Sequence, residues 1–139
     1  MIQRIQTVYL LLAAAFVGVL LGLAGGWFTA LDGAYPWLLP ATYALGGLTA
    51  GLALLGVFFY QNRTLQGKVV LAAQVADLAL VLVLAVALGL SAFGPEATDA
   101  DLTRATVILL PVLAYVGLVL ARRGVRRDIE LVRSMDRLR

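Results

Sequence analysis

The chain has 139 residues, of which 62% are apolar and 14% are charged, and its formal net charge is +3. Globular domains are about 45–50% apolar and about 25% charged, and a water-soluble domain needs a polar surface that this sequence cannot supply. The composition therefore excludes an ordinary soluble domain and predicts an all-α integral membrane protein.

The first predicted span covers about residues 5–30 and lies in an uncharged run longer than the roughly 20 residues that cross a bilayer. It follows Arg4, but it is too long for the h-region of a signal peptide, about 7–15 residues. We therefore interpret it as a retained span. Gly18, Gly22 and Gly26 recur every four residues and share one helix face.

The second predicted span covers about residues 38–60, and Gly47 and Gly51 repeat the four-residue spacing. Small residues let helices approach closely in lipid, where packing replaces the hydrophobic effect. Because a short turn at 32–36 makes the first two spans neighbours, we expect their glycine faces to pack against each other. The alternative is that one glycine face receives a helix of another subunit.

The third predicted span, about residues 69–92, contains one charged residue, Asp77, about 12 Å along the helix from Val69. An ionisable side chain at that depth costs roughly 2.5–3.5 kcal/mol, so Asp77 is expected to face the bundle. Gln74 lies on the same face. The candidate partners at similar depth are Tyr115, Thr106, Tyr9, Thr7 and the long side chains of Arg4, Lys68 and Arg122.

Asp77 has three possible interpretations. It is a hydrogen-bonded pin that fixes the packing of the third span, a contact with a partner subunit, or a proton or ion site. A transport pathway normally has several ionisable groups in series, whereas this chain has one deep acid and no His. The pin is therefore the favoured interpretation.

The fourth predicted span covers about residues 103–121, and Pro111 within it is expected to kink the helix. A cytoplasmic tail, 122–139, is expected to continue as an amphipathic helix. Basic residues at the inner ends of the spans are expected to contact anionic lipid headgroups or a partner; they are Arg4, Arg122, Arg123, Arg126 and Arg127. The alternative is that these residues only fix the topology.

The positions of the basic residues predict the orientation. Ten of the eleven Lys and Arg residues lie before the first span, between the second and third, or after the fourth, and only Arg104 lies on the other side. Basic loops stay in the cytoplasm. The sequence thus predicts a single domain, 1–139, forming an antiparallel four-helix transmembrane bundle with both termini cytoplasmic.

The chain contains no Cys and no His. It thus lacks the ligands of Fe–S clusters, the commonest zinc and haem ligands, and the usual general base near neutral pH. Phosphate-binding loops and nucleophile elbows are also missing from the sequence. We expect no catalytic residue, no cofactor, no metal and no nucleic-acid partner.

Two segments carry a family resemblance. The opening MIQRIQTVYLLLA (1–13) and the ending DIELVRSMDRLR (128–139), together with the four-span layout, resemble a bacterial domain-of-unknown-function family of small four-span inner-membrane proteins. The resemblance implies an inner-membrane location and supplies no catalytic residues. It also implies that Gln3, Arg4 and Gln6 share a cytoplasmic surface with the Arg-rich tail.

The sequence favours a non-catalytic accessory subunit of a larger bacterial inner-membrane complex, such as a respiratory electron-transfer complex, with other membrane subunits and phospholipids as partners. One alternative is a small homo-oligomeric transporter or channel with Asp77 as its ion site. Another is a free-standing lipid-binding assembly factor that acts through the Arg-rich tail.

Overall fold

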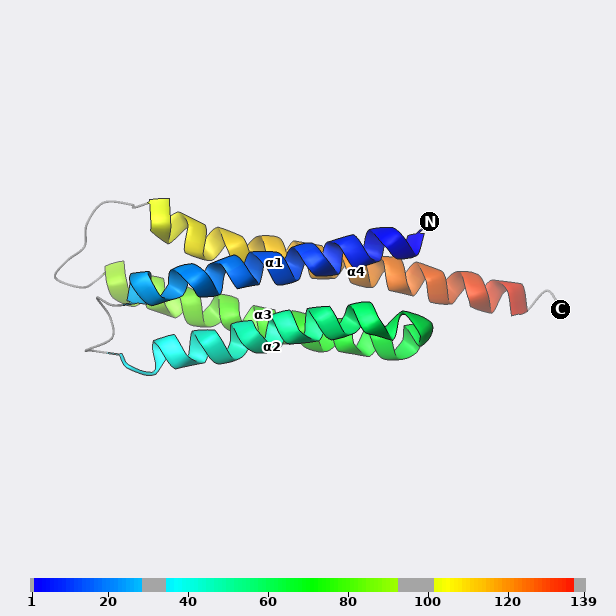
Figure 1. Cartoon of the computed structure of the whole chain (residues 1–139), viewed down its shortest axis with the longest axis horizontal. Helices are drawn as coiled ribbons and strands as arrows, with labels where there is room; N and C mark the ends of the chain where they lie inside the picture. Colours follow the sequence, from blue (N-terminus) through cyan, green and yellow to red (C-terminus); the bar gives the residue numbers. More distant parts are fainter. Residues whose placement is uncertain (1, 29–34, 93–101, 137–139) are drawn as a thin grey trace.

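The computed structural model describes residues 2–28, 35–92 and 102–136. Within these ranges it contains four long α-helices and a short 3₁₀ helix, and no strand: α1 Ile2–Phe28, α2 Leu38–Phe58, η1 Phe59–Gln61, α3 Arg63–Ala92 and α4 Leu102–Asp136. Figure 1 shows the four helices lying side by side in one bundle. Each helix packs against two neighbours, in the order α1, α2, α3, α4 and back to α1.

All four helices are long and apolar enough to cross a membrane. Within the described residues, the predicted all-helical architecture is confirmed, with four helices long and apolar enough to span a membrane. The outer surface agrees with it, because large apolar side chains on the outside of the bundle are strongly exposed; examples are Val75 at 62%, Leu82 at 61% and Leu109 at 56%. Such a surface suits lipid and not water.

The start of α3 differs from the predicted span. The helix begins at Arg63, six residues before the expected start at 69. Asn62 caps it, because its side-chain oxygen accepts a hydrogen bond from the backbone N–H of Leu65 at 3.1 Å. Polar residues in the first turns of α3 lower its hydropathy without interrupting the helix, so the helix begins before the apolar span that the sequence predicts.

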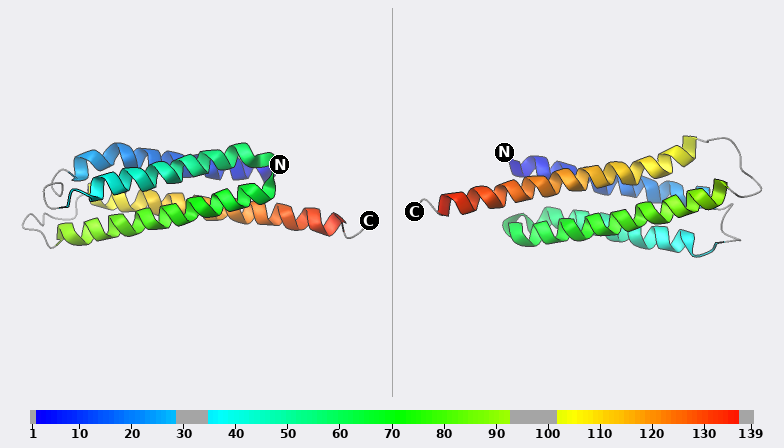
Figure 2. Two further views of the ribbon diagram at one scale, coloured as in Figure 1. Left: turned by 90° about the horizontal axis from the view of Figure 1, so that it is seen from below. Right: turned by 180° about the vertical axis from the view of Figure 1, so that it is seen from behind.

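The fourth span and the tail form one helix. α4 continues through Arg122 to Asp136, and it passes Pro111, which is buried, without a break in the helix. Figure 2 shows from two further sides that the C-terminal part of α4 extends past the ends of the other helices. As far as Asp136, the tail therefore continues the helix of the span.

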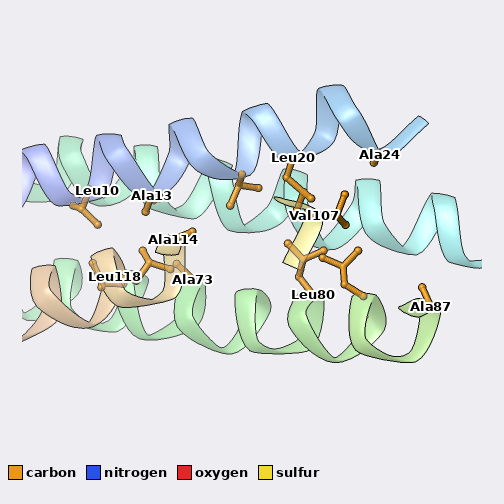
Figure 3. Close-up of a cluster of buried hydrophobic side chains, with 14 of the residues drawn as sticks. Leu10, Ala13, Leu20, Ala24, Ala73, Leu80, Ala87, Val107, Ala114 and Leu118 are labelled. Atoms are coloured by element: carbon orange, nitrogen blue, oxygen red, sulfur yellow. The ribbon is translucent and has the colours of Figure 1, made fainter. Parts of the chain in front are cut away.

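The core is a line of small and medium apolar side chains. Figure 3 shows Ala13 of α1, Ala73 of α3, and Ala114 and Leu118 of α4 close together in the part of the cluster that also contains Leu10. All four are 0% exposed. Side chains this short let the helices lie close together, which is the packing that stabilises bundles in lipid.

The glycines that support this packing are not the predicted ones. A Cβ on Gly18, Gly22, Gly26, Gly47 or Gly51 would meet no neighbouring heavy atom within 4 Å, and all five residues are exposed. The expectation that the two glycine faces pack against each other within the chain is therefore wrong. Four-residue spacing shows that residues share a face, but it does not show which face turns inward.

Other glycines lie at the helix contacts. A Cβ on Gly46 would lie 2.6 Å from Cδ2 of Leu21, which brings α2 against α1. A Cβ on Gly117 would lie 3.3 Å from the backbone oxygen of Tyr9, which brings α4 against α1. These positions hold glycine because the neighbouring helix occupies the space of a side chain.

Candidate functional site: the buried polar residues

Asp77 lies in the middle of α3 and is 0% exposed. Asp77 therefore faces the inside of the bundle, as expected from the free-energy cost of placing an acidic side chain in lipid. Both carboxylate oxygens are buried, and neither has a hydrogen-bond partner among the described residues. Buried polar atoms are almost always paired, so these oxygens mark Asp77 as the chemically unusual residue of the bundle.

Gln74, one turn before Asp77, is 6% exposed and has a partner. Its Oε1 accepts a hydrogen bond from Nη1 of Arg122 on α4 at 3.1 Å. Arg122 thus makes a contact inside the chain that the surface prediction did not include. The contact joins α3 to α4 and directs the guanidinium to the amide and not to Asp77.

Tyr115 lies level with Asp77 but does not bind it. α3 and α4 are in register at Gly67 and Val125, because a Cβ on Gly67 would lie 3.6 Å from Cγ1 of Val125. Asp77 lies ten residues after Gly67, and Tyr115 lies ten residues before Val125. Both steps cover about 15 Å, so the two residues occupy the same level. Tyr115 is half-buried, and no hydrogen bond reaches the carboxylate of Asp77. The same result applies to the other candidate partners whose side chains are described.

Thr49 on α2 is a buried polar residue that the sequence analysis missed. It is 0% exposed, and its hydroxyl has no hydrogen-bond partner among the described residues. Thr42, two turns earlier, is equally buried, but its hydroxyl donates to the backbone oxygen of Leu38 at 2.9 Å. The signal that could have found Thr49 is the stripe of mostly small residues, spaced by three or four, that forms the buried face of α2.

A second polar cluster joins three helices at the end of the bundle where α2 turns into α3. Asp128 of α4 is 7% exposed, and its Oδ2 accepts a hydrogen bond from Nε2 of Gln6 on α1 at 3.3 Å. Arg63 of α3 forms an ion pair with the same oxygen at 3.9 Å and donates to the backbone oxygen of Asp128 at 3.4 Å. These contacts fix the first part of the tail against the bundle.

The α2–α3 turn is closed by one further side chain. Nε2 of Gln66, which is 4% exposed, donates to the backbone oxygen of Gly56 at 2.9 Å. This oxygen lies near the end of α2, where carbonyl groups lack helical partners. Gln66, Arg63 and Asp128 are not among the site residues predicted from the sequence, because all three lie outside the predicted spans and nothing in their spacing marks them as partners.

The remaining predicted contact residues face outward. Arg123, Arg126 and Arg127 are exposed, and the side chain of Arg4 lies outside the described part of the structure. Contact of these residues with headgroups or with a partner stays a prediction. Among residues 2–28, 35–92 and 102–136, no group of three or more His, Cys, Asp or Glu that could hold a metal ion is found.

Residues 35–138 match the family model of a domain of unknown function (DUF4293). The chain belongs to this family. The match includes most of the Arg-rich ending on which the resemblance partly rested, but not the opening 1–13. No curated protein and no solved structure matches the chain. Membership of an uncharacterised family is thus confirmed, and the family supplies no activity.

Proposed function

We propose that this chain is a non-catalytic accessory subunit of a larger bacterial inner-membrane complex, such as a respiratory electron-transfer complex. In this proposal the four helices form an antiparallel bundle across the membrane, with both termini in the cytoplasm. The excess of basic residues on one side of the predicted spans supports that orientation.

The observation that carries the proposal is the outward position of the glycine faces. Gly18 and Gly22 on α1 and Gly47 and Gly51 on α2 are exposed, and a Cβ at each would have open space around it. A helix gains nothing from glycine on a lipid-facing surface, whereas a neighbouring helix can pack closely against it. These faces suit the helices of partner subunits.

The basic end of α4 supports a second part of the proposal. Arg123, Arg126 and Arg127 are exposed near the end of the predicted fourth span. Each basic residue close to an anionic membrane surface contributes about 1 kcal/mol of binding. We propose that they hold the subunit against anionic phospholipids on the cytoplasmic side.

The test is purification of the tagged full chain from native membranes in mild detergent, followed by mass spectrometry and native-gel sizing. The wild-type chain is expected to recover larger membrane subunits in fixed proportion. Gly22→Leu is expected to reduce that recovery because the side chain fills the packing face. Ala72→Leu is the matched control, since Ala72 is exposed on α3 and lies outside the glycine faces.

Three outcomes would contradict the proposal. Recovery that is equal for Gly22→Leu and the wild type would show that the glycine face is not the contact. A homo-oligomer without other subunits would favour a transporter or channel. A monomer that carries only anionic lipid would favour a free-standing lipid-binding protein.

A further inference from the structure

The buried faces of α2 and α3 contact each other at Gly56 and Val70. A Cβ on Gly56 would lie 3.4 Å from Cγ2 of Val70, which fixes the register. The buried residues step by three or four along each helix; they are Gly56, Ala53, Thr49, Gly46 and Thr42 on α2, and Val70, Ala73, Asp77, Leu80 and Leu84 on α3. The two series run in opposite directions along the interface.

This register places Thr49 opposite Asp77. Seven residues back from Gly56 lead to Thr49, and seven residues onward from Val70 lead to Asp77. Both steps cover about two helical turns, or about 10 Å, so the two residues occupy the same level of the interface. The facing positions otherwise hold small or apolar residues, apart from Thr42, whose hydroxyl is bonded to its own helix.

The same two residues hold buried side-chain oxygens without partners. Among the described side chains, the orphaned buried atoms are Oγ1 of Thr49 and both carboxylate oxygens of Asp77. Thr42 shows that a buried threonine on this face can satisfy its hydroxyl on its own helix, as it does with Leu38 at 2.9 Å. The unsatisfied polar atoms of the two residues therefore lie at the same level of the α2–α3 interface, and each destabilises the bundle unless another group pairs with it.

Among the described side chains, no positive charge is paired with Asp77. α2 has no Asp, Glu, Lys or Arg, and none occurs in α1 after Arg4. The titratable or charged side chains nearest in register on the other helices and on α3 are Tyr9, Tyr43, Tyr115, Lys68 and Arg122. None of them donates a hydrogen bond to the carboxylate, and Arg122 is bonded to Gln74.

We propose that Asp77 and Thr49 form a buried proton-binding site between α2 and α3. Asp77 carries the proton as a neutral carboxylic acid, and one enclosed water joins it by hydrogen bonds to the hydroxyl of Thr49. A lone ionised carboxylate in an apolar interior is far more costly than a neutral one. The site offers three oxygens, whereas divalent cations such as calcium take six to eight. A proton therefore suits it better than a divalent metal ion.

Infrared spectroscopy of the full chain in lipid nanodiscs, with aspartate carboxyls labelled by carbon-13, tests the proposal. At pH 7 the wild-type chain is expected to show the C=O band of a neutral carboxylic acid. Asp77→Asn should abolish this band, whereas Asp128→Asn should retain it. Thr49→Val should shift the band because the hydrogen bond is lost, and the matched control Thr42→Val should not.

Two spectroscopic results would overturn the inference. Wild-type and Asp77→Asn spectra without a difference in the carboxylic-acid region would show that Asp77 is ionised. An identical band in Thr49→Val and the wild type would show that Thr49 is not its partner.

Chemical labelling of the wild-type chain keeps the inference testable if a variant fails to fold. A hydrophobic carbodiimide reacts with protonated carboxyls in apolar surroundings, so one adduct is expected, mapped by fragment mass spectrometry to Asp77. Absence of that adduct would count against the site. Protection of Asp77 by sodium or lithium at constant pH would show that the site takes a metal cation instead of a proton.

Discussion

Gly117 gives a direct test of how α1 and α4 pack. A Cβ at this position would lie 3.3 Å from the backbone oxygen of Tyr9 and 3.6 Å from Cβ of Ala13. In Gly117→Val two methyl carbons stand about 1.5 Å beyond that Cβ. At least one of them would overlap α1, and backbone atoms cannot move aside as a flexible side chain can, so the helices must separate.

Overpacking of this kind costs typically 1–3 kcal/mol, and we expect Gly117→Val to lower the free energy of unfolding by about 2 kcal/mol. The measurement is reversible unfolding in mixed micelles with increasing sodium dodecyl sulfate, followed by circular dichroism. Gly22→Val is the matched control because its Cβ meets nothing within 4 Å; its effect should stay within about 0.5 kcal/mol. Equal losses in the two variants would refute the assigned helix contact.

The same unfolding assay tests the polar contacts at the α2–α3 end. Asp128→Ala leaves the buried amide of Gln6 without its acceptor and is expected to cost about 1–3 kcal/mol, whereas Glu130→Ala, at an exposed position of the same helix, should change stability by less than about 0.5 kcal/mol. Similar losses in both variants would contradict this. Gln66→Leu removes the hydrogen bond to the oxygen of Gly56 and is expected to cost about 1 kcal/mol; unchanged stability would mean that the bond does not hold the turn.

The sequence predicts the four helices well because hydropathy measures what a bilayer requires, a long segment with few charges. Hydropathy does not indicate the first turns of α3, because the helix begins at Arg63 in a polar segment. It also does not separate the fourth span from the tail, because α4 remains helical from Leu102 to Asp136. Hydropathy reports the surroundings of a residue and not its backbone conformation.

The inward face of each helix is harder to predict. In water the apolar side of a helix turns inward, but in lipid both sides are apolar, and the choice depends on shape. Gly46 turns inward and Gly47 outward, although composition alone does not distinguish them. Asp77 could be placed because its charge makes one orientation far more costly. A threonine can satisfy its own hydroxyl and face either way, so the polarity of Thr49 does not place it, and only the spacing of the small residues on α2 indicates its inward position.

α4 is long enough to extend beyond the rest of the bundle. From Pro111 to Asp136 the helix is unbroken and about 37 Å long, and its far part extends past the other helices. Asp128 ties α4 to α1 and α3 near the edge of the bundle, so only residues 129–136, about 12 Å of helix, lie beyond the tie. A tilt of this segment therefore acts on α1 and α3 through Asp128.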